Sequence, residues 1–131
     1  MLKKFRQGEH GQALVEMALV LPIFLLLLFG VMEMGRVGYA YITVSNAARA
    51  GVRTATVGGT DLEIREAILN ASPSLDSAKL SIQISPDESH RESGQGVTVQ
   101  VSYPVQLIIP VISNLVSNPV IVGSTLSMRL E

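Results

Sequence analysis

The segment from Ala13 to Met32 constrains this chain more than any other feature. It is apolar over about 20 residues except for Glu16, and as a helix it would be about 30 Å long. That length is enough to cross the hydrocarbon core of a bilayer. A carboxylate inside such a segment costs free energy, so it marks a candidate functional residue. The sequence therefore predicts a membrane-inserted protein in which Glu16 has a special role.

The charges that flank this segment predict its orientation. Lys3, Lys4 and Arg6 precede it, whereas Arg36 is the one basic residue within about fifteen residues after it. This asymmetry indicates a cytoplasmic N-terminus and an extracytoplasmic C-terminal part. The apolar run is also longer than the core of a cleaved signal peptide, which is roughly 7–15 residues. An uncleaved signal anchor is therefore one interpretation of the segment.

Two residues argue for more than a plain anchor. Pro22 leaves the carbonyl of Ala18 without its helical partner, so we expect a kink or local melting there. Glu16 has two interpretations. It could extend its carboxylate to the cytoplasmic interface, or it could pair with a new α-amine created by cleavage after Gly11. At the far end of the segment, Glu33 is expected to pair with Arg36, three residues later on the helix.

The helical pattern continues beyond the apolar segment. We expect one helix from Gln12 to about Val57, because Gly58 and Gly59 provide a left-handed cap and a turn. A stripe with heptad-like spacing follows this second half, and it is either the packing face for the C-terminal lobe or a seam between copies. The stripe consists of Val37, Tyr41, Val44, Ala48, Gly51 and Ala55.

The remainder of the chain predicts a small α+β lobe. Thr60 and Glu63 have the spacing of a capping box, which predicts a short helix that ends near Ala71. Alternating apolar and polar residues predict three strands. The fold class is thus α+β, with a long N-terminal helix on a small antiparallel sheet and one short extra helix. The expected strands cover residues 80–85, 97–107 and 120–130.

Composition limits the function. The net charge of −1 gives no basis for binding nucleic acid, and the absence of cysteine excludes disulfides and zinc–thiolate sites. His90, in the acidic loop 86–96, is too isolated to predict a metal site. No catalytic constellation is present, so we expect neither an enzyme nor a cofactor. The loop 108–119 is unusually apolar, and it either tucks under the sheet edge or forms an exposed patch that binds a partner or a membrane surface.

Three segments resemble the TadE-like family, the pilin-like proteins of tight-adherence (Flp-type) pilus systems in bacteria. The first runs from Gly11 to Pro22 (GQALVEMALVLP), the second from Gly30 to Tyr41, and the third from Asn46 to Arg53. The closing strands, with Val97–Pro104 and the terminal residues 128–131, are also similar to members of that family.

This resemblance has implications for processing and architecture. It implies cleavage by a prepilin peptidase between Gly11 and Gln12, which would make Glu16 the fifth mature residue. It further implies insertion in the inner membrane before assembly. The expected regions are a prepilin-type leader (1–11), a transmembrane half-helix (12–36) and a soluble lobe with the second half of the helix (37–131).

The sequence therefore predicts a minor pilin or pseudopilin that acts in assembly of a tight-adherence pilus. Its partners would be the prepilin peptidase, other pilin subunits, the assembly machinery and membrane lipid. Glu16 would neutralise an N-terminal amine and set the axial register of the packed helices. Two alternatives remain open: a major filament-forming pilin, and an unprocessed single-pass membrane protein with an extracytoplasmic binding lobe.

Overall fold

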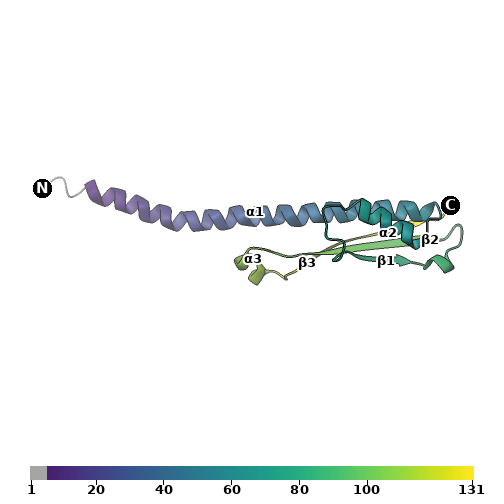
Figure 1. Ribbon diagram of the computed structural model, residues 1–131. Helices are drawn as coiled ribbons and strands as arrows, with labels where there is room; N and C mark the ends of the chain where they lie inside the picture. Colours follow the sequence, from purple (N-terminus) through teal and green to yellow (C-terminus); the bar gives the residue numbers. More distant parts are fainter. Residues whose placement is uncertain (1–5) are drawn as a thin grey trace. The chain divides into compact units, whose positions relative to one another are not determined.

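The chain folds into a long helix and an α+β lobe, and the computed structural model describes residues 6–131, with side chains from Gly11 onward. Two compact units are present, one that ends at Met34 and one that comprises Gly35–Glu131. Helix α1 (Arg6–Thr56) contributes residues to both units (Figure 1). With its three-stranded antiparallel sheet and two further α-helices, the structure confirms the predicted α+β class.

Helix α1 differs from the prediction at two points. It begins at Arg6 rather than Gln12, so part of the expected leader is helical, because a glycine such as Gly11 does not prevent helical dihedral angles. Residues 1–5 of that leader lie outside the described residues. The helix also continues through Pro22 without a break, so the expectation of local melting was wrong. A proline removes one backbone bond, and the neighbouring turns retain theirs.

The C-terminal end of α1 confirms the glycine cap. Gly58 has a positive φ of 82°, a left-handed conformation that favours glycine. Its N–H donates to the carbonyl of Ala55, and the N–H of Gly59 donates to the carbonyl of Thr54, both at 3.1 Å. These two bonds form a Schellman motif, which satisfies carbonyls that would otherwise lack a partner at the helix end.

Helix α2 (Asp61–Asn70) begins as the capping box predicted. The hydroxyl of Thr60 accepts a hydrogen bond from the N–H of Glu63 at 3.3 Å, and the Glu63 carboxylate accepts one from the N–H of Thr60 at 2.8 Å. Ile64 and Ile68 form its buried face. The capping box therefore orients α2 so that these side chains reach the core.

The sheet has the strand order β1–β2–β3, and both pairings are antiparallel. The strands are β1 (Ser81–Ser85), β2 (Gly96–Val105) and β3 (Val120–Arg129). Their register aligns apolar side chains across the sheet, as in the row Ile84, Val99 and Leu126. Serine, threonine and glutamine occupy most alternate positions, and this period of two gives the sheet one apolar face.

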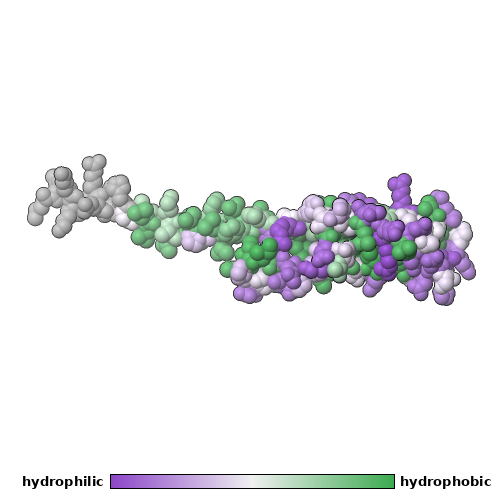
Figure 2. All heavy atoms as spheres, viewed as in Figure 1, coloured by the Kyte–Doolittle hydropathy of each residue, from purple (hydrophilic) through white to green (hydrophobic). Residues whose placement is uncertain are grey.

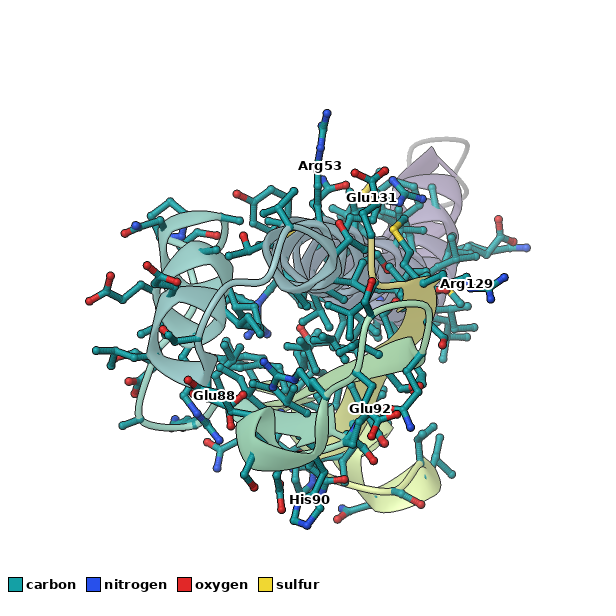
Figure 3. All side chains as sticks on the ribbon, turned by 90° about the vertical axis from the view of Figure 1, so that its right-hand side faces the viewer. Arg53, Glu88, His90, Glu92, Arg129 and Glu131 are labelled. Carbon is teal, nitrogen blue, oxygen red and sulfur yellow. The ribbon has the colours of Figure 1, made fainter. Side chains whose placement is uncertain are left out.

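The core lies between this apolar face and the helices. Figure 3 shows α1 and α2 on one side of the sheet. Val44 and Val52 of α1, Ile64 of α2 and Val99 of β2 are fully buried. Each such side chain contributes about 1.5–3 kcal/mol through burial. The residues of α1 from Gly35 onward are thus part of the lobe.

Candidate membrane-spanning and assembly helix

The first half of α1 has an apolar surface that nothing in the described chain covers. No residue of its most apolar 18-residue window is buried, and among the described residues this is the one helix that could cross a membrane by length and composition. Large side chains such as Leu14, Phe24 and Leu27 are exposed. Figure 2 shows hydrophobic residues over the visible face of this half-helix. A surface of this kind is suited to contact with lipid or other subunits.

Glu16 has a polar partner that the sequence argument did not consider. The side-chain amide of Gln12 donates to the Glu16 carboxylate, with Nε2 and Oε1 3.2 Å apart. The two residues are one helical turn apart, which explains the contact. In the uncut chain the backbone nitrogen of Gln12 is a peptide nitrogen inside α1. The amine suggested as the partner of Glu16 would therefore exist only after cleavage.

Gly11 and Gln12 lie within α1 and are exposed. A Cβ atom added to Gly11 would meet nothing within 4 Å. Packing within the chain therefore does not require a glycine at this position. Cleavage at this bond stays a prediction.

Glu33 and Arg36 lie on either side of the boundary between the two compact units. Glu33 is only 4% exposed, an unusual burial for a carboxylate. The guanidinium of Arg36 donates to the carbonyl of Gln106, with Nη2 and the oxygen 3.3 Å apart. This bond links α1 to the segment that follows β2. The ion pair expected between Glu33 and Arg36 stays a prediction.

The predicted stripe of α1 lies mostly against the lobe. Val37 is half-buried, whereas Tyr41 is 53% exposed and does not belong to the packed face. Ala40 occupies the buried position instead, because it lies one turn before Val44 on the same row and its small side chain permits close packing. The other four members, Val44, Ala48, Gly51 and Ala55, are buried.

Arg91 is a structural residue that the sequence argument missed. Its side chain is only 7% exposed, and it pairs with the carboxylate of Asp61. It also donates to the carbonyls of Gly59 and Pro86, each at 3.1 Å. No local pattern marks it, because Gly59 and Asp61 lie about 30 residues earlier in the chain. Arginine has several donors in a planar fork, which suits it to such a junction.

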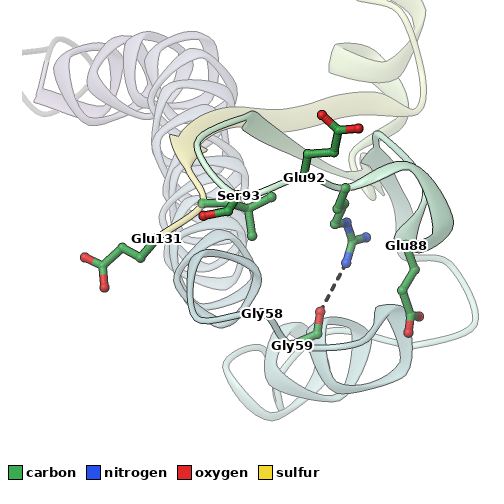
Figure 4. A pocket seen from close by; sticks show the side chains of 8 residues that line it. Gly58, Gly59, Glu88, Glu92, Ser93 and Glu131 are labelled. Atoms are coloured by element: carbon green, nitrogen blue, oxygen red, sulfur yellow. Dashed lines mark hydrogen bonds between the residues drawn. The ribbon is translucent and has the colours of Figure 1, made fainter.

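A pocket of about 280 Å³ lies beside this junction (Figure 4). Glu88 and Glu92 line it together with Arg91, whose guanidinium is already bonded to Gly59. His90 is exposed, and it points away from the core in Figure 3. Among the described residues, no three metal-ligating side chains are grouped.

The apolar loop forms an exposed surface rather than a buried one. Helix α3 (Pro110–Leu115) occupies its centre, and no residue of α3 is buried. Of the two alternatives left open by the sequence, the structure favours the exposed patch. Its most exposed apolar side chains are Ile108, Val111, Leu115 and Val116.

These features define a class: an α+β protein with a long N-terminal helix whose exposed first half is suited to a membrane, the architecture expected of a pilin-like protein. Residues 11–53 match the family model of TadE-like proteins, which confirms the resemblance over this segment. The match supports a pilin-like protein associated with tight-adherence pili, a structural rather than an enzymatic family. No curated protein and no solved structure matches the chain at a significant level.

Proposed function

We propose that this protein is a minor pilin or pseudopilin of a tight-adherence pilus that acts in pilus assembly. One observation carries the proposal: the exposed apolar half of α1 lies within the segment that matches TadE-like proteins. The protein would first reside in the inner membrane, with a cytoplasmic N-terminus and an extracytoplasmic lobe. Its partners would be a prepilin peptidase, other pilin subunits and the assembly machinery.

Processing prepares the helix for assembly in this proposal. Hydrolysis of the bond between Gly11 and Gln12 removes the basic leader and creates an α-amine. The absence of a packing requirement at Gly11 supports a role for this glycine in recognition by the peptidase. A small residue there would let the peptidase approach the backbone closely.

Assembly then transfers the apolar surface of α1 from lipid to protein. Helices of neighbouring subunits would cover the side chains between Ala13 and Met32, and burial of apolar area would favour the transfer. Glu16 would pair with an N-terminal amine of its own or an adjacent subunit. In a low-dielectric environment an unpaired carboxylate is costly, so this pair would favour one axial register over others.

Mass spectrometry of the native protein tests the processing step. We expect the mature N-terminus at Gln12 in cells with an active prepilin peptidase, and an intact leader in cells that lack it. An intact Met1 in peptidase-positive cells would contradict the proposal. Abundant homopolymer in the sheared surface fraction would contradict the minor role and indicate a major pilin instead.

The Glu16→Ala variant tests the register step. It should insert in the membrane normally, because it removes a costly charge, yet it should fail to assemble. Met17→Ala is the matched control, since Met17 is a neighbouring exposed residue of the same helix. Cross-linking of membranes and filaments measures both steps. Normal incorporation of the Glu16→Ala variant into filaments would reject the proposed role of Glu16 in setting the axial register.

A further inference from the structure

A compact apolar surface surrounds α3, and it comprises Ile108, Val111, Leu115 and Val116; we call it the α3 patch. Leu115 is 81% exposed, and the other three are at least half exposed. Figure 2 shows hydrophobic residues gathered at α3 on the face in view. Ile109 and Ile112 are half-buried, so they fix this segment to the lobe. The outward side chains of the patch thus belong to a segment that packs against the lobe.

The backbone of this segment forms its hydrogen bonds internally. The N–H groups of Ser113 and Val116 donate to the carbonyls of Ile109 and Ile112, at 2.9 and 3.1 Å. The N–H of Leu107 donates to the side chain of Asn118 at 3.0 Å. Backbone groups that enter an apolar medium must be satisfied within the protein, because no water is available there. Much of the backbone of the α3 segment is therefore already hydrogen-bonded before the segment contacts lipid or another protein.

The two ends of the lobe differ in their content of charged residues. The chain contains no Asp, Glu, Lys or Arg between Glu92 and Arg129, so the α3 patch lies in a long uncharged stretch. The opposite end carries several charged residues, and Figure 3 shows them from that side. An apolar surface whose own segment carries no charge has a low cost of transfer into lipid, and the nearby guanidinium of Arg36 is bonded to the carbonyl of Gln106.

The chain itself limits how far the α3 patch can lie from the membrane. Arg36 follows Met32 by four residues of the continuous helix α1, a rise of about 6 Å along the helix axis. Its hydrogen bond to Gln106 holds the segment that leads into Ile108 at the same end of the lobe. The headgroup layer on each side of a bilayer is about 5–7 Å thick. When the apolar half of α1 spans the bilayer, the segment that leads into the patch therefore begins close to the headgroup layer.

We propose that the α3 patch inserts into the outer interfacial layer of the membrane and makes a second contact with lipid beside the transmembrane half of α1. This inference rests on the proposed function, because it requires that the apolar half of α1 spans the bilayer. The contact would hold the lobe against the membrane before assembly. A partner protein or a second copy could cover the same patch, and the experiment below distinguishes these occupants.

The test uses single cysteines introduced into the full chain, which has no natural cysteine. Leu115→Cys, labelled with an environment-sensitive fluorophore, reports on the patch in vesicles of phosphatidylethanolamine and phosphatidylglycerol. Leu62→Cys is the matched control, because Leu62 is also an exposed leucine (68%) on a helix, at the opposite end of the lobe. Leu27→Cys reports on the span. Nitroxides on the lipid headgroup or on the acyl chain act as quenchers.

At position 115 we expect a blue shift of the fluorescence emission and quenching by the headgroup nitroxides. At position 27 we expect quenching by the acyl-chain nitroxides. At position 62 we expect no emission shift and no quenching. Quenching at 27 without quenching at 115 would overturn the inference and leave the membrane span intact. Loss of quenching at 27 would overturn both proposals. A blue shift at 115 that appears only at high protein-to-lipid ratio, without quenching by lipid nitroxides, would assign the patch to a second copy and reject the lipid contact.

A charge variant provides an independent check. With the label at position 111 (Val111→Cys), the added change Leu115→Glu should abolish the shallow quenching, because the carboxylate opposes insertion of the patch. The change Leu62→Glu should leave that quenching unaffected. Equal quenching in the presence of either glutamate would contradict the proposal.

Discussion

At the scale of single residues, Arg91 illustrates how one side chain can join distant loops. It contacts Asp61 and Gly59, which lie 30 and 32 residues earlier in the chain, and it also binds the carbonyl of Pro86. The guanidinium is therefore well satisfied, although it is nearly buried. A lysine could not reproduce these contacts, because one ammonium cannot present the same planar set of donors.

Arg91→Met is expected to destabilise the lobe by about 2–3 kcal/mol. The change leaves the part-buried carbonyls of Gly59 and Pro86 without these donors, and an unsatisfied group costs about 1–3 kcal/mol when it is buried. The contribution of Asp61 is discounted, because its side chain is 37% exposed and partly solvated. Urea titration of the full chain in detergent micelles, with unfolding monitored by hydrogen exchange of the β2 amides, measures the change in the free energy of unfolding. Arg53→Met is the control, since Arg53 is exposed and should change stability by less than about 0.5 kcal/mol.

At the scale of elements, the approach of α1 to its neighbours depends on small residues. A Cβ atom added to Gly51 would lie 2.6 Å from Cγ1 and 2.7 Å from Cδ1 of Ile68. Ile68 is fully buried, so it has little space to move. Gly51 therefore permits α2 to pack closely against α1.

Gly51→Ala should destabilise the lobe by about 1 kcal/mol. Overpacking a core costs about 1–3 kcal/mol, whereas replacing a helical glycine with alanine gains up to about 1 kcal/mol. Gly38→Ala is the matched control in the same helix, because a Cβ there meets nothing within 4 Å, and it should be stabilising. The same urea titration compares both variants. A Gly51→Ala protein as stable as the parent would contradict this prediction, because it would show that the cost of moving Ile68 does not exceed the helix-propensity gain of alanine.

At the scale of the whole molecule, the two compact units differ in what surrounds their apolar side chains. The described residues before Gly35 expose apolar side chains, whereas Gly35–Glu131 contains the hydrophobic core. The second part of α1 belongs to that core through residues such as Val44 and Val52. The helix therefore has one part suited to lipid or other subunits and another that is structurally part of the lobe.

The fragment 35–131 is expected to fold, whereas the fragment 60–131 is not. Without the second part of α1, the lobe loses the burial of Val44 and Val52, at about 1.5–3 kcal/mol each, together with several alanines. This loss is comparable to the total stability of a small domain, about 5–15 kcal/mol. The dispersion of amide resonances in NMR spectra distinguishes the two outcomes. A disordered 35–131 fragment would show that the lobe depends on the apolar first half of α1.

Local patterns predicted most of the elements. The Thr60 capping box, the Gly58 cap and the alternation in β2 were all confirmed, because each depends on residues within a few positions of one another. The exposed apolar half of α1 was likewise evident from composition. Two details of α1 were wrong, its start and the local melting expected at Pro22. A glycine such as Gly11 does not prevent helical dihedral angles, and a proline removes one backbone bond while the neighbouring turns retain theirs.

Long-range packing decided what these patterns left open. The sequence by itself determined an apolar helix, a glycine stop and three alternating strands, since side-chain periodicity and backbone preference act locally. Only the tertiary structure brought Arg91 to Gly59 and Asp61. It also left Tyr41 exposed, buried Ala40 and exposed the side chains around α3. These outcomes depend on which surfaces pack against one another in the fold. The free energy of that packing comes from residues far apart in the chain, so no single segment of the sequence predicts it.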